Sequence, residues 1–214
     1  MNSKNYGGIK ILDKKSVFID CSVKIGKNVT IYENNRIEGN TIIGDGVTIL
    51  PNCYIKNTVI GEGSTFNYSQ SENAIVGKNV SVGPFARLRP NATIKDGAKI
   101  GNFVEIKNAV IGEGTKVSHL AYVGDADVGK NCNIGCGAIF VNYNGKEKNR
   151  TIVQDDCFIG SNCNIIAPVT IKSGSYICAG TTVTDDVNGD DFVIGRVRQQ
   201  VKEGRAHMYL KNKE

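Results

Sequence analysis

His119 is the residue in this sequence whose type best suits acid–base chemistry. The chain has two histidines, and an imidazole titrates near neutral pH, as an effective general base should. A lone histidine is more often an ordinary surface or structural residue. His119, however, stands beside a spaced pair of cations and at the head of a series of small residues. We therefore predict a catalytic role for it.

The pair of cations is Arg89 and Lys107. They lie 18 residues apart, and each directly follows a large aliphatic residue, Leu88 or Ile106. Like charges at equivalent positions of neighbouring strands repel each other. The two side chains are either solvated cations that splay apart or a clamp for a phosphate dianion, which would remove the repulsion and accept charge-assisted hydrogen bonds. We favour the clamp.

A six-residue repeat predicts the elements that position these side chains. Large aliphatic residues recur at every sixth position over 19–55, 76–106 and 159–183, with one-residue contractions between these runs. A small or β-branched residue stands two positions before most of them, so both point to one face of a short strand. Three hexads would close a triangular coil of 18 residues, and no helical period competes with this pattern. The fold class is therefore all-β, a parallel β-helix of about nine coils.

The same count brings small residues together at one corner of the coil. His119, Cys136, Ser161 and Ala179 each lie two positions after the large aliphatic residue of a hexad in four successive coils. We call this series the rail. His119 forms one end of it.

The repeat also divides the chain. We expect an N-terminal cap over residues 1–18, the β-helix over 19–183 and a basic C-terminal tail over 184–214. The spacing over 66–76 is irregular, which predicts a loop or a distorted corner. About seven extra residues break the beat within 142–150 and predict a looped-out arm that covers a ligand.

The bulk composition excludes several classes of function. The net charge of +5 is spread along the chain without the block of like charges that is typical of nucleic-acid or membrane arms. The sequence shows neither a membrane-spanning apolar run nor a signal peptide, and its seven cysteines have no paired spacing, so we expect a cytoplasmic protein with free thiols. Cys132 points inward while Cys136 lies at a corner, so we predict no metal site.

Several motifs resemble a known family. FARLRP, GNFVEIK, SHLAYVGDA, NIGCGAIFVNYNGKEK, IGSN and AGTTV stand at irregular intervals between Phe85 and Val183. They are similar to the acetyltransferase domain of the bifunctional UDP-N-acetylglucosamine pyrophosphorylases/glucosamine-1-phosphate N-acetyltransferases, which are hexapeptide-repeat acyltransferases. The resemblance implies a left-handed β-helix, a homotrimer with sites at subunit interfaces, and direct acetyl transfer from acetyl-CoA to glucosamine 1-phosphate. No glycine-rich nucleotide-binding signature precedes the repeats, so uridylyl transfer is not expected of this chain, which is either a stand-alone acetyltransferase served by a separate uridylyltransferase or a truncated product.

The resemblance also implies roles for individual residues. His119 would be the general base, and the backbone N–H of Cys136, where the family usually has alanine, would stabilise the oxyanion. Glu105 could orient His119, although the repeat places it over Tyr122. The residues implied to hold the sugar phosphate are Arg89, Lys107, Tyr122, Asn133 and, from a neighbouring subunit, Lys148. The residues implied to bind acetyl-CoA are Cys136, Asn142, Tyr143, Ser161, Ala179 and Arg196.

Two alternatives remain open from the sequence. One is an acyltransferase of the same fold that acts on another amino or hydroxy sugar. The other is a non-catalytic β-helix that serves as an assembly or regulatory module, which would have no need for His119, Arg89 and Lys107 in this arrangement. A carbonic anhydrase on this fold is disfavoured, because its metal needs three histidine ligands and the chain has two.

Overall fold

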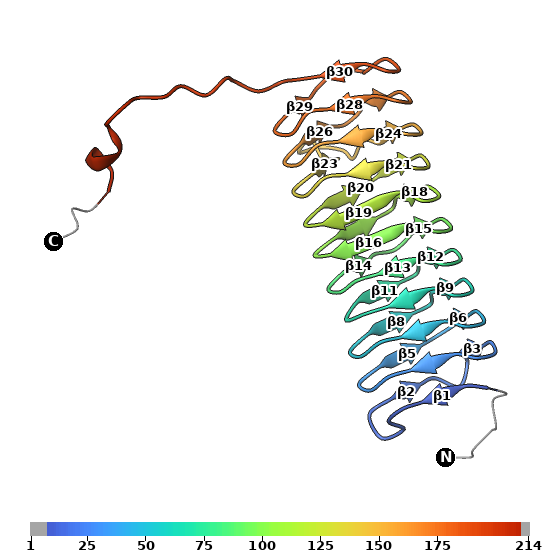
Figure 1. The fold of residues 1–214 in the computed structure, drawn as a ribbon. Coiled ribbons are helices and arrows are strands. Elements are labelled where there is room, and N and C mark those ends of the chain that lie inside the picture. The colour runs from blue at the N-terminus through green and yellow to red at the C-terminus, as the bar shows by residue number, and fades with distance from the viewer. Residues whose placement is uncertain (1–7, 211–214) are drawn as a thin grey trace.

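The structure is a computed structural model that describes residues 8–210, and it is a solenoid of three parallel sheets (Figure 1). The predicted N-terminal cap and C-terminal tail therefore lie partly outside the described residues, at 1–7 and 211–214. Every named strand pairs in parallel with the strand one coil away, so the prediction of a parallel β-helix is confirmed.

Over residues 8–210 the sheets contain eleven, ten and nine strands, and we call them A, B and C in the order in which the chain visits them. The strands of sheet A are β1 (Lys10–Ile11), β4 (Thr30–Ile31), β7 (Thr48–Ile49), β10 (Thr65–Phe66), β13 (Ser81–Val82), β16 (Lys99–Asn102), β19 (Lys116–His119), β22 (Asn133–Ile134), β25 (Phe158–Ile159), β28 (Tyr176–Ile177) and β30 (Phe192–Val193). The strands of sheet B are β2 (Phe18–Ile19), β5 (Arg36–Glu38), β8 (Tyr54–Lys56), β11 (Gln70–Glu72), β14 (Arg87–Leu88), β17 (Glu105–Lys107), β20 (Tyr122–Gly124), β23 (Ile139–Val141), β26 (Asn164–Ile166) and β29 (Thr182–Val183). The strands of sheet C are β3 (Lys24–Ile25), β6 (Ile42–Ile43), β9 (Val59–Ile60), β12 (Ile75–Val76), β15 (Thr93–Ile94), β18 (Val110–Ile111), β21 (Ala126–Val128), β24 (Thr151–Val153) and β27 (Thr170–Ile171).

The core is a column of stacked aliphatic side chains inside the triangle. The large residue of each hexad is almost completely buried, as Ile55, Ile100 and Ile159 show at 0% exposure. The small residue two positions earlier is buried beside it, for example Ala98 at 1%. Because the narrow interior admits one large and one small side chain per side, the six-residue pattern is a packing requirement.

The corners between the sheets require an unusual backbone conformation. Many corner residues have a positive φ, which is the left-handed region that only glycine, asparagine and aspartate adopt at little cost. Asn91 (φ 65°) and Asn108 (φ 46°) follow this rule. Phe85 (φ 57°) and Phe103 (φ 56°) do not follow it.

Two details of the repeat differ from the prediction. The segment 66–76 is neither a loop nor a distorted corner, because β11 pairs with β8 and β14 and Ser71 occupies the interior position of the large residue, five residues after Phe66 and five before Val76. The Ser71 hydroxyl lies 2.9 Å from that of Thr58, so a buried hydrogen bond stands where aliphatic contact was expected. A polar residue therefore concealed the repeat from a count of aliphatic positions.

The sheets also extend beyond residues 19 and 183. β1 pairs with β4 at the N-terminal end, and β30 pairs with β28 at the C-terminal end. Beyond β30 the chain leaves the solenoid as an extended arm that ends in a short 3₁₀ helix, η1 (Ala206–Met208) (Figure 1). Within residues 8–210, no helix has the length and apolar character needed to cross a membrane.

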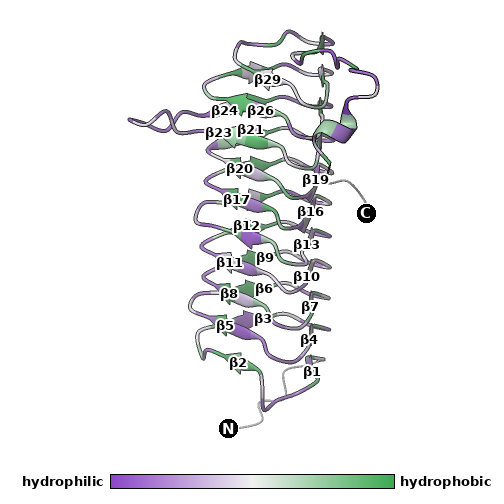
Figure 2. Cartoon of the chain, turned by 90° about the vertical axis from the view of Figure 1, so that its left-hand side faces the viewer, coloured by the Kyte–Doolittle hydropathy of each residue, from purple (hydrophilic) through white to green (hydrophobic). Residues whose placement is uncertain are grey.

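One insertion interrupts the stack between β23 and β24. Its residues project from the side of the solenoid as a narrow, largely hydrophilic hairpin (Figure 2). Tyr143 and Lys148 form an antiparallel bridge within it, and Gly145 (φ 93°) lies near its tip. The predicted looped-out arm is therefore present.

Candidate functional site

The rail is formed as the hexad count predicted. Pairing of Val117 with Ile134, and of Ile134 with Ile159, places His119, Cys136 and Ser161 at the same corner of consecutive coils. Pairing of Ile159 with Ile177 adds Ala179 in the next coil. The rail follows the corner that joins sheet A to sheet B, which we call the A–B corner.

His119 has a hydrogen-bond partner that the sequence analysis missed. Its Nδ1 lies 2.6 Å from Oδ1 of Asn102, the residue in register with it on β16. A carboxamide oxygen only accepts, so Nδ1 must carry the proton and Nε2 keeps its lone pair. The exposed imidazole is thereby held in the tautomer that a general base needs at Nε2. Counting the contraction between Ile106 and Ile111 would have revealed this pair.

Glu105 does not contact His119. It lies in register with Tyr122, as the repeat indicated, and its Oε1 accepts a hydrogen bond from Nη1 of Arg89 at 2.8 Å. The hypothesis that Glu105 orients the histidine is therefore wrong, because its carboxylate is engaged by the guanidinium on the neighbouring strand.

The backbone N–H of Cys136 is accessible to a ligand, whereas the glycine before it has no space for a side chain. Among the hydrogen bonds of the described residues, the N–H of Cys136 donates to no acceptor, whereas those of Gly135 and Gly137 bond to the adjacent coils. A Cβ on Gly135 would lie 2.6 Å from the backbone of Gly160 and Ser161. The coils therefore stack tightly here, and the Cys136 N–H is left available as a donor, as are the N–H groups of Ser161 and Ala179 among the bonds of the described residues.

Arg196 lies at the C-terminal end of the rail. Its Nη1 donates a 3.0 Å hydrogen bond to the carbonyl oxygen of Ala179, and its Cδ is 3.6 Å from the position that a Cβ on Gly180 would occupy. The rail thus extends from an imidazole to a guanidinium over four steps of about 4.8 Å each, roughly 19 Å.

Arg89 and Lys107 are adjacent, as predicted, at the corner that joins sheet B to sheet C, which we call the B–C corner. The pairing of Leu88 with Ile106 sets this register. Each cation already has a carboxylate partner: Arg89 binds Glu105 at 2.8 Å, and Lys107 binds Asp125 at 3.2 Å. Their mutual repulsion is therefore already offset within the chain, which the sequence analysis did not foresee.

Asp125 is the centre of a small polar network at this corner. It accepts hydrogen bonds from Asn108 at 2.5 Å, from Lys107 and from Nδ2 of Asn142. Burial alone would raise the pKa of Asp125, but the hydrogen bonds from these two amides and the ammonium hold it below its ordinary value. The family resemblance implied that Asn142 binds acetyl-CoA, whereas in the structure its side chain is buried against Asp125.

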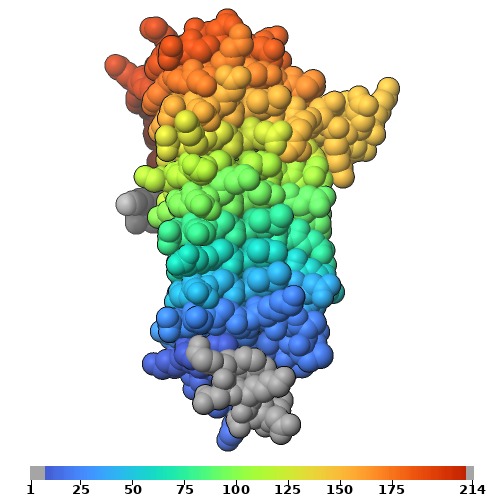
Figure 3. All heavy atoms as spheres, turned by 90° about the vertical axis from the view of Figure 1, so that its right-hand side faces the viewer, coloured from blue at the N-terminus to red at the C-terminus, as the bar shows by residue number. Residues whose placement is uncertain are grey.

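The loop is anchored at its base and projects at its tip. Arg150 binds both carboxylate oxygens of Asp127, at 2.6 and 2.5 Å, and donates to the carbonyl oxygens of Asn108 and Ala126. Tyr143 is 56% exposed and lies on the projecting part. In the space-filling view the hairpin stands clear of the body of the solenoid (Figure 3).

Lys148 bends back from the loop to the B–C corner. Together with Arg89, Lys107, Asn108 and Asp125 it lines an open hollow there. The nearby ammonium of Lys107 lowers the pKa of Lys148. Three cations thus face two carboxylates, which leaves a net charge of one positive unit for an anion.

The structure therefore places the predicted residues in two groups. The rail and Arg196 lie at the A–B corner, whereas Arg89, Lys107, Asn142 and Lys148 lie at the B–C corner. A single rung of sheet B, which carries Tyr122, separates the corners by about five residues, at most roughly 16 Å. Asn133 lies on β22 of sheet A, in register with Lys116 below it and Phe158 above it.

The chain is similar to two family models and to known proteins. The model described as the GMPPB C-terminal domain matches residues 70–144, and the model described as bacterial transferase hexapeptide (six repeats) matches residues 22–57 and 150–185. The chain is 48% identical over 196 residues to the bifunctional protein GlmU of Geobacillus sp. (strain WCH70) and 47% identical over 197 residues to that of Clostridioides difficile (strain 630). Each match covers 92% of this chain and 43% of the relative, so the chain spans less than half the length of these proteins.

Solved structures share the fold at lower identity. The UDP-N-acetylglucosamine acyltransferase of Arabidopsis superposes with a TM-score of 0.62 and 20% identity, over 83% of this chain and 69% of that one. This likeness and the hexapeptide match support the left-handed sense predicted for the coil.

Proposed function

The chain belongs to the hexapeptide-repeat family, as a relative of the bifunctional GlmU proteins, and we propose that it transfers the acetyl group of acetyl-CoA to the amino group of glucosamine 1-phosphate. The observation that carries this proposal is the rail. It aligns an oriented imidazole, an available backbone N–H, a row of small residues and a guanidinium along one corner.

His119 acts as the general base. Its Nε2 takes a proton from the 2-amino group of the sugar as the nitrogen lone pair attacks the thioester carbonyl. Oδ1 of Asn102 accepts the hydrogen bond from the Nδ1–H group and stabilises the imidazolium that forms. The tetrahedral intermediate then expels the CoA thiolate, which takes the proton held on Nε2 of His119, so that the imidazole returns to its neutral form. The transfer is direct within a ternary complex, and no acyl-enzyme forms.

The backbone N–H of Cys136 stabilises the oxyanion. A donor aimed at the developing charge is typically worth a factor of about 10² to 10³ in rate. Because the donor is a main-chain group, the thiol of Cys136 has no required role. The pantetheine arm of the donor lies along Ser161 and Ala179, whose small side chains leave room for it, and Arg196 meets a nucleotide phosphate.

The sugar phosphate binds at the B–C corner. Arg89 and Lys107 receive the phosphate dianion, which competes with Glu105 and Asp125 for them, and Lys148 adds a third cation. The sugar ring lies along the sheet-B rung that carries Tyr122, so its amino group faces the A–B corner. Asn133 contacts the sugar from sheet A. Because the side chains of Arg89, Lys107 and Lys148 are long, they shorten the distance between the two corners that the sugar phosphate has to span.

We also propose that the working unit is a homotrimer. An apolar ridge of large side chains follows the A–B corner directly below His119. The members of this ridge are Tyr68, Phe85, Phe103 and Leu120, which are between 42% and 56% exposed and all have a positive φ. Large apolar residues in this costly conformation favour a contact with a second copy. The neighbouring copy would then bring the exposed tip of its loop, with Tyr143, toward the rail.

The test is release of CoA thiol from acetyl-CoA in the presence of glucosamine 1-phosphate. The unmodified chain should release thiol only when the sugar is present. We expect His119→Ala to lower kcat by about 10²- to 10⁴-fold, because proton abstraction is lost. Cys136→Ala should remain active, because its role is carried by the backbone. Equal rates for the unmodified chain and His119→Ala would remove the histidine from the mechanism.

A further inference from the structure

A stack of three aromatic rings occupies the outer face of sheet A at its C-terminal end. Phe158, Tyr176 and Phe192 lie in register on β25, β28 and β30. The ring centroids are 4.5 Å apart for the first pair and 5.3 Å apart for the second, with interplanar angles of 10° and 15°. We call these residues the aromatic ladder. All three side chains are exposed, Phe192 most of all at 68%.

The ladder has one free ring face. Within residues 8–210, β30 is the last strand of sheet A, so no rung of that sheet follows Phe192. At the other end of the ladder, Asn133 lies in register below Phe158. A flat π-system could therefore extend the ladder only on the outer face of the Phe192 ring, at the end of the solenoid.

The rail leads to the same place. Phe158 precedes Ser161 by three residues, and Tyr176 precedes Ala179 by three, so ladder and rail are parallel columns about 10 Å apart. Arg196 stands at the end of the rail and is held there by its bond to Ala179. Arg196, which could bind a phosphate, and the free ring face of Phe192 thus both lie near the end of the rail.

The proposed donor has matching chemistry at matching positions. Acetyl-CoA carries its thioester at one end of a flexible arm, and phosphates and an adenine at the other. With the thioester at Cys136 and the arm along the rail, the nucleotide reaches the level of Arg196 and Phe192 after about three coils, roughly 14 Å. We propose that the adenine of acetyl-CoA stacks on the free face of Phe192 and continues the aromatic ladder. This inference rests on the proposed function.

The alternative role for the ladder is to stabilise the last coils by stacking the rings on one another. The two roles differ in what they predict for the donor. A purely structural ladder would affect stability and all donors alike, whereas an adenine platform would affect only donors that contain adenine.

The experiment compares acetyl-CoA with acetyl-pantetheine, which has the same thioester arm and no nucleotide. We expect Phe192→Ala to raise the KM for acetyl-CoA about tenfold, because the loss of one base–aromatic stack typically weakens binding by that order. The kcat and the KM for the sugar phosphate should stay unchanged, as should the KM for acetyl-pantetheine. Phe192→Leu keeps apolar bulk without a ring and should behave like the alanine variant, and Phe192→Trp should restore binding.

An unchanged KM for acetyl-CoA, or an equal rise for both donors, would overturn the adenine platform while leaving the acetyl transfer intact. Failure of the proposed function would look different, because the unmodified chain would then release thiol from neither donor. Calorimetric titration with CoA supplies a readout that is independent of turnover. The unmodified chain should bind CoA about tenfold more tightly than Phe192→Ala, and equal affinity or no binding by the unmodified chain would contradict the inference.

Discussion

At the scale of single residues, the site depends on pairs that stand one coil apart. His119 with Asn102 and Arg89 with Glu105 are examples, separated by 17 and 16 residues in the sequence. A parallel β-helix brings such residues within about 4.8 Å of each other along the axis. Each side chain on the outer surface therefore contacts mainly the residues directly above and below it in the neighbouring coils.

Asn102 provides the residue-scale prediction. We expect Asn102→Leu to lower kcat about tenfold with the KM values for both substrates unchanged. Without the hydrogen bond to Asn102 the imidazole tautomer is no longer fixed, and one hydrogen bond of about 1.4 kcal/mol corresponds to a tenfold change in rate. Steady-state kinetics with each substrate varied in turn would measure this. Asn102→Asp keeps an oxygen acceptor at the same position and should recover most of the activity. A change in KM instead of kcat would show that Asn102 contacts a substrate.

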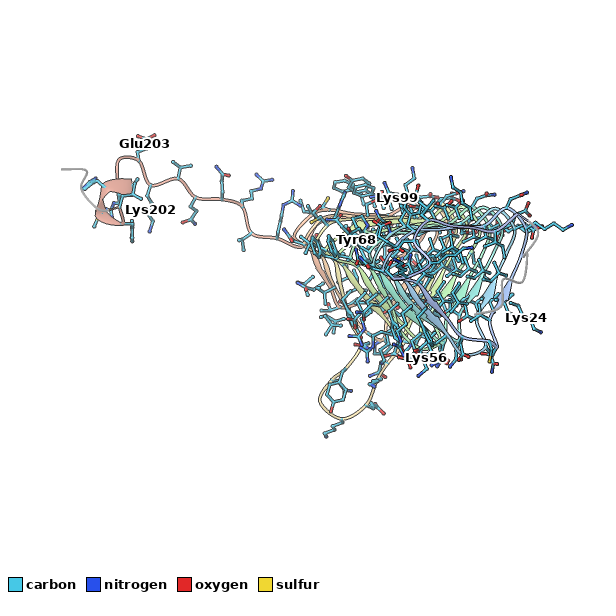
Figure 4. All side chains as sticks on the ribbon, turned by 90° about the horizontal axis from the view of Figure 1, so that it is seen from below. Lys24, Lys56, Tyr68, Lys99, Lys202 and Glu203 are labelled. Carbon is cyan, nitrogen blue, oxygen red and sulfur yellow. The ribbon has the colours of Figure 1, made fainter. Side chains whose placement is uncertain are left out.

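At the scale of elements, the B–C corner connects the loop to the solenoid. Asp125 joins Lys107 and Asn108 of one coil to Asn142 at the start of the loop, and Asp127 holds Arg150 at its end. Both ends of the loop are therefore fixed through carboxylates of β21 and the residue before it. The loop projects on the side of the solenoid that carries Lys56, away from the C-terminal arm (Figure 4).

Asp125 gives a pH prediction. Its pKa is lower in the folded chain than the ordinary 3.8, so the stability that it contributes is complete above that value and is lost as the pH falls through the folded pKa. We expect Asp125→Asn to lower the free energy of unfolding by about 1 to 3 kcal/mol at pH 7, with a smaller difference below about pH 4. Urea denaturation at pH 7, 5 and 3 would measure it.

The exposed Asp185 offers a control for this series. Asp185→Asn should change the free energy of unfolding little at any of the three pH values. A difference for Asp125→Asn that is as large at pH 3 as at pH 7 would contradict the assignment, because protonation of the native carboxyl should by then have removed part of the interaction.

At the scale of the whole molecule, the two corners that hold the predicted site residues lie at opposite ends of the sheet-B rungs. Within one chain, the loop at the B–C corner projects away from the rail at the A–B corner. A second copy whose loop reaches the first copy's rail would add its exposed Tyr143 to the donor-binding residues there. The apolar ridge beside His119 is the surface on which we expect that contact.

The ridge can be tested with a substitution that suits its backbone. Asparagine tolerates a positive φ far better than phenylalanine does, at a saving of up to about 1 to 2 kcal/mol per residue. The double variant Phe85→Asn and Phe103→Asn should therefore stay folded while losing apolar surface. We expect sedimentation velocity to show a shift from trimer toward monomer.

The control removes exposed apolar surface from a different face. Ile42 and Ile75 lie on the outer side of sheet C, at 42% and 54% exposure, and threonine suits both strand positions. Ile42→Thr with Ile75→Thr should leave association unchanged. Dissociation by this pair, or a ridge variant that remains trimeric, would place the subunit contact elsewhere.

The sequence by itself determined the interior of this protein. The narrow core accepts one large and one small side chain per side, so the six-residue beat fixed the coil and the register of the rail from His119 to Ala179. It also placed Arg89 beside Lys107. The six-residue count was hidden around Ser71, where a hydrogen bond to Thr58 replaces aliphatic contact and the interior positions Phe66, Ser71 and Val76 are five residues apart.

Only the tertiary structure decided the arrangement of the outer surface. Outward side chains are under no periodic packing constraint, so the repeat that puts Asn102 in register with His119 does not determine that the two side chains bond, nor that Asp125 binds Asn142. The continuation of sheet A through β30 was likewise decided by backbone pairing, because Phe192 and Val193 follow a turn that does not keep the six-residue count. Packing in the interior follows the six-residue repeat of the sequence, whereas contacts on the surface depend on which polar side chains lie one coil apart.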